Sequence, residues 1–187
     1  MTASTDPVEL LERAVSYARR ALDSIGDDLT VPTPCRAWTL MELLDHMSDS
    51  LDALIEASGG AVALSVPARA TIGEPLRVET LQHKACALVG VWAGRGTGRV
   101  QIGDTDIHPE ILVRTGALEI AVHGWDVAVA SGRDDDMPAE LCGALLPTAE
   151  LLVSPADRGV RFAEPVPVPH SASATARLLG FLGRAAA

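Results

Sequence analysis

The chain has 187 residues, of which 48% are hydrophobic and only 3% aromatic, and it carries a formal net charge of −10 with a sequence pI near 4.8. This length suffices for one domain with a real core, so we expect residues 1–187 to form a single helical domain. The acidic balance excludes nucleic acid as an expected partner, because Lys and Arg must replace the counterions of the phosphates.

The cysteines and the N-terminus indicate the compartment. Cys35, Cys86 and Cys142 are widely spaced and form no Cys-x-x-Cys pair, which favours a reducing cytoplasm over a disulfide framework. None has a histidine at readable spacing, so none is expected to be a nucleophile. The opening MTASTDPVEL lacks the features of a signal peptide, and no apolar run approaches the ~20 residues of a membrane span. We therefore expect a cytoplasmic protein without a membrane partner.

The first two helices are predicted by signals at their ends. Asp6 is placed to cap the first helix, and Gly26 is expected to end it. Thr39 and Glu42 have the spacing of a capping box, which predicts a second helix over residues 40–58.

The rest of the chain alternates further helices with loops. The predicted segments are a crossing loop over 61–74, a third helix over 75–94, a short strand over 100–102, a fourth helix over 109–131, a fifth over 138–153 and a short last helix over 173–183. Four principal amphipathic helices with one long crossover are typical of an all-α four-helix bundle. We expect short extra helices near the C-terminus and at most one short strand pair.

The fourth predicted helix contains ionisable residues in an otherwise apolar stretch, ALEIAVHGWDVA. Glu119 and His123 are four residues apart and therefore share a face, beside an apolar stripe expected to run from Ile111 to Val129. His46 flanks the apolar stripe of the second helix in the same way. Two imidazoles and one carboxylate are what a catalytic divalent ion takes, with one position left open. The same spacing is also typical of a solvated helix face, and the residues alone leave both interpretations open.

Polar residues other than these three candidate ligands have different expected roles. Asp126 lies one turn beyond His123 and is placed to orient its imidazole through the second ring nitrogen. We expect Asp45 to be a surface acid, His83 to be exposed and His108 to lie at the entrance of the fourth helix. None of these last three is expected to be a ligand.

Two segments together carry a resemblance to a known family. TPCRAWTLMELLDHM and the later EIAVHGWDVAVASGR resemble the DinB-like metalloprotein superfamily, and more closely the actinobacterial group similar to the N-terminal domain of mycothiol-dependent maleylpyruvate isomerase. The tail, FAEPVPVP…ARLLGFLGR, is similar to the C-terminal segment of this group, so that the resemblance covers nearly the whole chain. It implies a DinB-like four-helix bundle that holds a divalent ion, zinc first and nickel or iron as alternatives, with His46, Glu119 and His123.

The resemblance also implies a function. The family includes enzymes that use low-molecular-weight thiols such as mycothiol, and a metal-bound thiol loses its proton and becomes a nucleophile near neutral pH. We expect a metal-dependent thiol transferase or isomerase-like enzyme that acts on a small electrophilic substrate with a thiol or water, as a monomer or homodimer. The separate C-terminal domain of the isomerase is not matched, so its arginines are not carried over. A metal-dependent hydrolase or lyase of secondary metabolism and a non-catalytic metal-binding protein are the alternatives.

Overall fold

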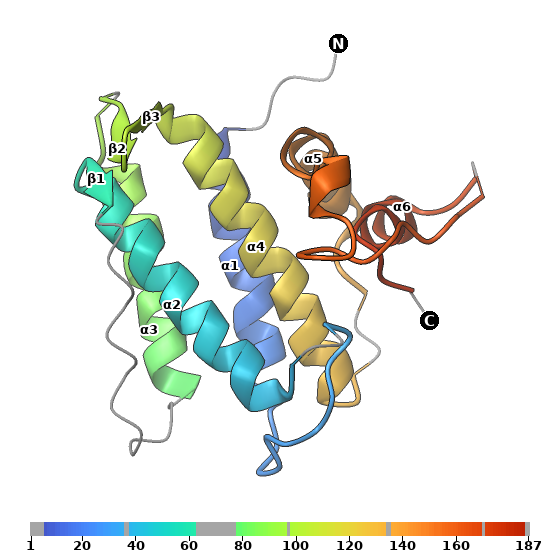
Figure 1. Ribbon diagram of the computed structural model, residues 1–187. Coiled ribbons are helices and arrows are strands. Elements are labelled where there is room, and N and C mark those ends of the chain that lie inside the picture. The colour runs from blue at the N-terminus through green and yellow to red at the C-terminus, as the bar shows by residue number, and fades with distance from the viewer. Residues whose placement is uncertain are drawn as a thin grey trace.

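The computed structural model describes residues 6–35, 38–62, 78–96, 98–133, 136–169 and 171–185. It is mostly helical, with a small sheet at one end (Figure 1). The elements in chain order are α1 (Pro7–Leu22), α2 (Leu40–Ser58), β1 (Ala61–Val62), α3 (Val78–Ala93), β2 (Val100–Ile102), β3 (Thr105–Ile107), α4 (Pro109–Ala130), α5 (Ala139–Leu152), the 3₁₀ helix η1 (Pro155–Asp157) and α6 (Ala174–Phe181).

Four long helices, α1 to α4, lie side by side and enclose the core. α4 packs along α1, α2 packs along α3, and the two pairs meet through α1 with α3 and α2 with α4. α5 packs on α4 and on α6, on the side of α4 that lies away from α3 (Figure 1). The core is built mainly from Leu, Val and Ala side chains, as the low aromatic content predicts. Among the described residues no helix is both long and apolar enough to cross a membrane.

The predicted caps of the first two helices are present. The Asp6 carboxylate accepts hydrogen bonds from the first-turn backbone of α1, and both halves of the Thr39–Glu42 capping box are formed at the start of α2. α2 has the predicted bounds, whereas α1 ends at Leu22, before Gly26. The Ala21 carbonyl in the last turn accepts from the Ser24 hydroxyl at 2.6 Å and from the Ser24 N–H at 3.1 Å, so the helix ends without the glycine.

α4 differs from its prediction in how it is buried. Ile111 and Val129, the two ends of the expected apolar stripe, are exposed, and nearly all residues between Leu112 and Ala128 are buried around the whole helix. The cause is that α1, α2 and α5 all pack against α4. Polar side chains in the middle of α4 are therefore surrounded by protein on most sides and need partners.

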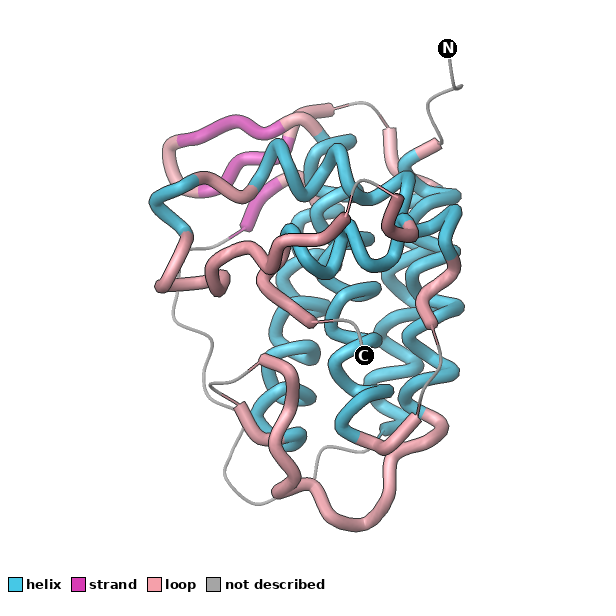
Figure 2. Tube along the Cα trace, turned by 90° about the vertical axis from the view of Figure 1, so that its right-hand side faces the viewer, coloured by secondary structure: helices cyan, strands magenta, loops and turns pink. Residues whose placement is uncertain are grey.

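The sheet has three strands, so the prediction of at most one strand pair is wrong. β2 pairs with β3 in an antiparallel hairpin whose turn contains Gly103 at φ 58°, and β1 adds to β2 in parallel (Figure 2). β1 occupies the first two positions of the predicted crossing loop. The rest of that loop and the start of the predicted third helix fall within residues 63–77, outside the described residues.

Candidate metal centre

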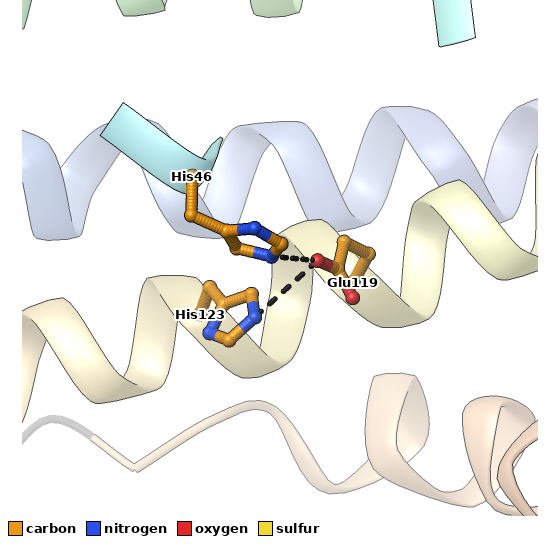
Figure 3. A group of neighbouring side chains, drawn as sticks. All are labelled: His46, Glu119 and His123. Carbon is orange, nitrogen blue, oxygen red and sulfur yellow. Dashed lines mark hydrogen bonds and ion pairs between the residues drawn. The ribbon is translucent and has the colours of Figure 1, made fainter. Parts of the chain in front are cut away.

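Two helices bring three possible metal ligands together. His46 comes from α2, and Glu119 and His123 come from successive turns of α4 (Figure 3). Glu119 Oε1 lies 2.6 Å from His46 Nε2 and 3.3 Å from His123 Nε2. The three ligand atoms all lie within 4.8 Å of one another. The structure thus places at one point the three residues that the sequence and the resemblance singled out.

Two glycines of α4 let the neighbouring helices approach closely on either side of the centre. A Cβ at Gly116 would lie 2.9 Å from a methyl group of Leu54 on α2, and one at Gly124 would lie 2.9 Å from the Ala18 Cα on α1. The Gly124 position needs glycine, because the Ala18 backbone cannot move aside, whereas at Gly116 the end of the Leu54 side chain can shift. α2 packs against α4, and His46 on α2 lies against Glu119 on α4.

The exposure of the three side chains is uneven. His46 and Glu119 are 33% and 32% exposed, whereas the His123 side chain is 9% exposed. The centre therefore opens to solvent on the side of His46 and Glu119, and it is closed behind His123.

Hydrogen bonds shift the pKa values of Glu119 and His123 in opposite directions. Burial by itself would raise the pKa of Glu119, but its bonds to His123 and His46 outweigh burial and hold the pKa well below its usual range. Burial would lower the pKa of His123, but its bonds to Asp126 and Glu119 raise the pKa to about 9. Without a metal, the centre at neutral pH is an imidazolium held between two carboxylates.

Asp126 has the orienting position expected from the sequence. It is fully buried, and its Oδ2 lies 2.9 Å from His123 Nδ1. Since an ionised carboxylate is only an acceptor, this contact keeps a proton on Nδ1 of His123 and directs Nε2 toward Glu119.

Sequence reasoning missed Arg184. Its Nε donates to Asp126 Oδ1 at 2.8 Å and its Nη2 to Asp126 Oδ2 at 2.7 Å, so a buried two-pronged ion pair supports the carboxylate that holds His123. No spacing rule connects two residues that are 58 positions apart. The available signal was an arginine directly after the apolar stretch LLGFLG.

A tryptophan covers one side of the two imidazoles. The centroid of the Trp38 ring lies 4.5 Å from that of His46 and 5.9 Å from that of His123. The Trp38 backbone is fixed in turn, because its N–H donates to the Cys35 carbonyl at 2.8 Å and its own carbonyl accepts from the Thr33 hydroxyl at 2.9 Å. The indole provides a rigid apolar wall against the imidazoles.

The remaining predicted positions lie where the sequence placed them. Asp45 and His83 are exposed, and His108 caps α4 by accepting from the Glu110 N–H. All three cysteines are free. Burial raises the pKa of the Cys35 thiol, with a further contribution from Asp126, and burial also raises the pKa of Cys142.

The donor set fits a divalent ion. Two imidazole nitrogens and one carboxylate oxygen are the ligands of catalytic zinc sites, which leave one position for water or substrate. The second ring nitrogen of His123 is bonded to a carboxylate, as ligating histidines usually require. Among the described residues, this is the group of His, Cys, Asp and Glu side chains whose spacing suits an ion.

Comparison with known proteins places the chain in a family. No protein-family model matches it. It is similar to two proteins of Mycobacterium tuberculosis, "Uncharacterized protein Rv0738" of strain H37Rv and "Uncharacterized protein MT0763" of strain CDC 1551. Each is 30% identical over 190 residues, which cover 96% of this chain and 98% of the relative. Because the similarity extends over nearly the whole of both chains, the chain belongs to the same family as the Rv0738 protein of this actinobacterium.

Proposed function

We propose that this protein is a divalent-metal-dependent enzyme of the thiol transferase or isomerase type, built as a DinB-like four-helix bundle from α1 to α4. The pairwise packing of these helices supports the bundle, and the sequence resemblance supports the superfamily. The observation that carries the function is the half-open centre, in which three convergent ligand atoms come from side chains of which two are about one-third exposed.

His46 Nε2, Glu119 Oε1 and His123 Nε2 would hold the ion, with zinc as the first candidate and nickel or iron as alternatives. When bound, such an ion lowers the pKa of a coordinated thiol or water, so that a nucleophile is available near neutral pH. Asp126 keeps a proton on Nδ1 of His123, so an ion would bind at Nε2 after that nitrogen has released its own proton. Trp38 shields the imidazoles from water on one side and leaves the side of Glu119 accessible.

Two of the chain's own cysteines, Cys35 and Cys142, do not suit the role of the reacting thiol. The thiolate is the nucleophilic form, and the raised pKa values of Cys35 and Cys142 keep both protonated near neutral pH. This supports a separate low-molecular-weight thiol of the mycothiol kind as the partner of a small electrophilic substrate. The three free cysteines also fit a reducing cytoplasm, where we place the protein as a monomer or homodimer.

The test is metal-dependent thiol conjugation. Protein purified without a histidine tag is analysed for metal, where about one ion per chain is expected for a single three-ligand centre. The zinc-loaded and the chelated protein are then compared in the conjugation of mycothiol, or of N-acetylcysteine as a surrogate, to 1-chloro-2,4-dinitrobenzene. Faster conjugation by the zinc-loaded form alone supports the proposal, and equal rates in both forms contradict it. Metal-dependent ester hydrolysis without thiol would instead support the hydrolase alternative.

A further inference from the structure

We infer that Arg184 is a positioning residue of the metal centre, and that the segment after α6 completes the centre by holding Asp126 against the ligand His123. This inference rests on the proposed metal site. The chain of contacts runs from the Arg184 guanidinium to the Asp126 carboxylate and from there to His123 Nδ1, with distances of 2.7 to 2.9 Å. No part of Arg184 has to touch the ion or the substrate.

The local backbone fixes Arg184 in place. Gly183 follows α6 with φ 78°, a conformation that favours glycine, and the Arg184 N–H then donates to the Leu179 carbonyl at 2.8 Å. A Cβ at Gly183 would lie 2.7 Å from the Cβ of Ala163 and 2.8 Å from its carbonyl oxygen. The segment is therefore closely packed against Ala163, and the arginine that follows has a defined direction into the protein.

Burial shows that the contact is more than a surface ion pair. Arg184 is 9% exposed and Asp126 is fully buried. A buried pair of this kind is often no more stabilising than apolar residues of the same volume, because both charges lose their hydration. Apolar side chains could therefore attach the C-terminal segment to α4 equally well. The need for a charged hydrogen-bond acceptor beside His123 gives a specific reason for the Arg184–Asp126 pair.

The geometry of the carboxylate explains how the arginine acts at a distance. The planar guanidinium binds both oxygens of Asp126 and so fixes the plane of the carboxylate. Oδ2 accepts from Arg184 and also from His123 Nδ1. The orientation of the His123 ring is therefore set by the carboxylate plane, and the carboxylate plane is set by Arg184. Arg184 also lines a cavity of about 300 Å³ beside Cys35 and Phe162, so its loss would admit water to Asp126.

The test compares metal affinity in matched arginine variants. Arg184→Gln removes the guanidinium that donates to both oxygens of Asp126. Arg184→Lys keeps the positive charge without the planar pair of donors, and Arg158→Gln is the control. Arg158 donates to the carbonyl of Phe181, the last residue of α6, and to that of Ala163, and neither of these hydrogen bonds involves Asp126. Zinc and cobalt affinities are measured by competition with a chromogenic chelator, and the ligand field of the cobalt form by its visible absorption spectrum.

We expect Arg184→Gln to weaken metal binding about 10- to 100-fold, the usual effect of removing an outer partner of a ligating histidine, and to change the cobalt spectrum. Arg184→Lys should recover part of the affinity, and Arg158→Gln should keep the wild-type affinity and spectrum even if its melting temperature falls. Wild-type affinity and spectrum in a folded Arg184→Gln or Arg184→Lys protein would overturn the inference and leave the proposed site standing. A wild-type protein that binds no metal would instead overturn the proposed site.

A measurement on the wild-type protein covers the case in which both Arg184 variants fail to fold. If Arg184 supports the metal-loaded centre, metal binding must in return stabilise the Arg184 contact, because coupling between two sites is reciprocal. Zinc should therefore slow the solvent exchange of the Arg184 Nε–H, measured by NMR, at least about tenfold. Unchanged exchange on zinc binding would contradict the inference.

Discussion

His46 Nε2 and Glu119 Oε1 lie 2.6 Å apart, although the two residues are 73 positions apart in the chain and belong to different helices. The same carboxylate oxygen lies 3.3 Å from His123 Nε2, so Glu119 holds both imidazoles in place. The helices α2 and α4 thus hold the three ligand atoms close together before an ion binds, so binding costs little further conformational entropy.

The first prediction concerns the ligands. His46→Ala and His123→Ala should each abolish stoichiometric metal binding, because either substitution leaves only two of the three ligands. Inductively coupled plasma analysis after dialysis gives the metal content of each variant. His83→Ala is the matched control, since His83 is an exposed helical histidine and should leave the content unchanged. An unchanged metal content in both ligand variants would contradict the proposed metal site.

These ligands also show what the sequence could predict. Glu119 and His123 share a face by simple helix geometry, but spacing could not connect His46 to them, because contact between two helices depends on packing; only the family resemblance joined the three. Arg184 was out of reach for the same reason. Its contact with Asp126 requires α6 to pack against α5, and the local sequence pattern does not predict that packing.

Local signals predicted helix positions well and strand pairing less well. The Thr39–Glu42 capping box placed the start of α2, since both of its hydrogen bonds are local. β1 was missed because Ala61 and Val62 are extended only through pairing with the distant β2. The all-round burial of α4 was missed because an amphipathic pattern assumes one covered face, whereas α4 has neighbours on several sides.

The second prediction is a pH dependence of the metal-free protein. The folded-state pKa of His123 is raised from 6.5 to about 9, so its contribution to stability is fully present below pH 6.5 and is lost as pH rises through 9. The free energy of unfolding of chelated protein should fall by about 1–3 kcal/mol between these pH values. Urea denaturation measures it.

The control for this dependence is His123→Gln, which should remove most of the fall within the same pH window. Zinc should remove it as well, because a metal ligand is already deprotonated and no proton is left to lose. An equal fall in the wild type, the variant and the zinc-loaded protein would assign the effect to other groups.

The third prediction tests the close approach of α1 and α4. Gly124→Ala should lower the free energy of unfolding by about 1–3 kcal/mol, because the new methyl group meets the Ala18 backbone and only a helix shift can relieve it. Gly90→Ala on α3 is the matched control. A Cβ at Gly90 has nothing within 4 Å, so alanine should be neutral or stabilise the helix by up to about 1 kcal/mol. Urea denaturation should show a loss of stability in Gly124→Ala but not in Gly90→Ala, and equal losses in both variants would argue against the tight contact.

The fourth prediction is that the protein folds without metal. Its core includes many fully buried leucines from α1, α2 and α3, and each contributes roughly 1.5–3 kcal/mol, so together they outweigh one ion. Chelated protein should keep its helical circular dichroism, and added zinc should raise the melting temperature by mass action. A chelated chain without helical signal would make the ion structural and would weaken the enzymatic proposal.

The last prediction concerns the chain's own thiols. If the reacting thiol is a separate small molecule, Cys35→Ser, Cys86→Ser and Cys142→Ser should each keep their metal and their conjugation rate within about twofold, which corresponds to less than 0.5 kcal/mol. Cys35 is the decisive position, because its half-buried thiol is close enough to Asp126 and Glu119 for both to raise its pKa. Cys142 is buried in α5, and its serine variant should lose stability before it loses activity.

Conjugation rate, metal content and melting temperature, measured on the same samples, separate these effects. A Cys35→Ser protein that keeps its metal and its melting temperature but loses conjugation would make the Cys35 thiol the reacting group, despite its raised pKa. Cys86 is exposed on α3 and serves as the control for surface thiols, because a slow background reaction of any accessible cysteine with the electrophile would fall in Cys86→Ser without depending on zinc. The proposal that an external thiol enters an open coordination position requires a conjugation rate that depends on both zinc and added thiol. The same rate must not depend on any of the three cysteines.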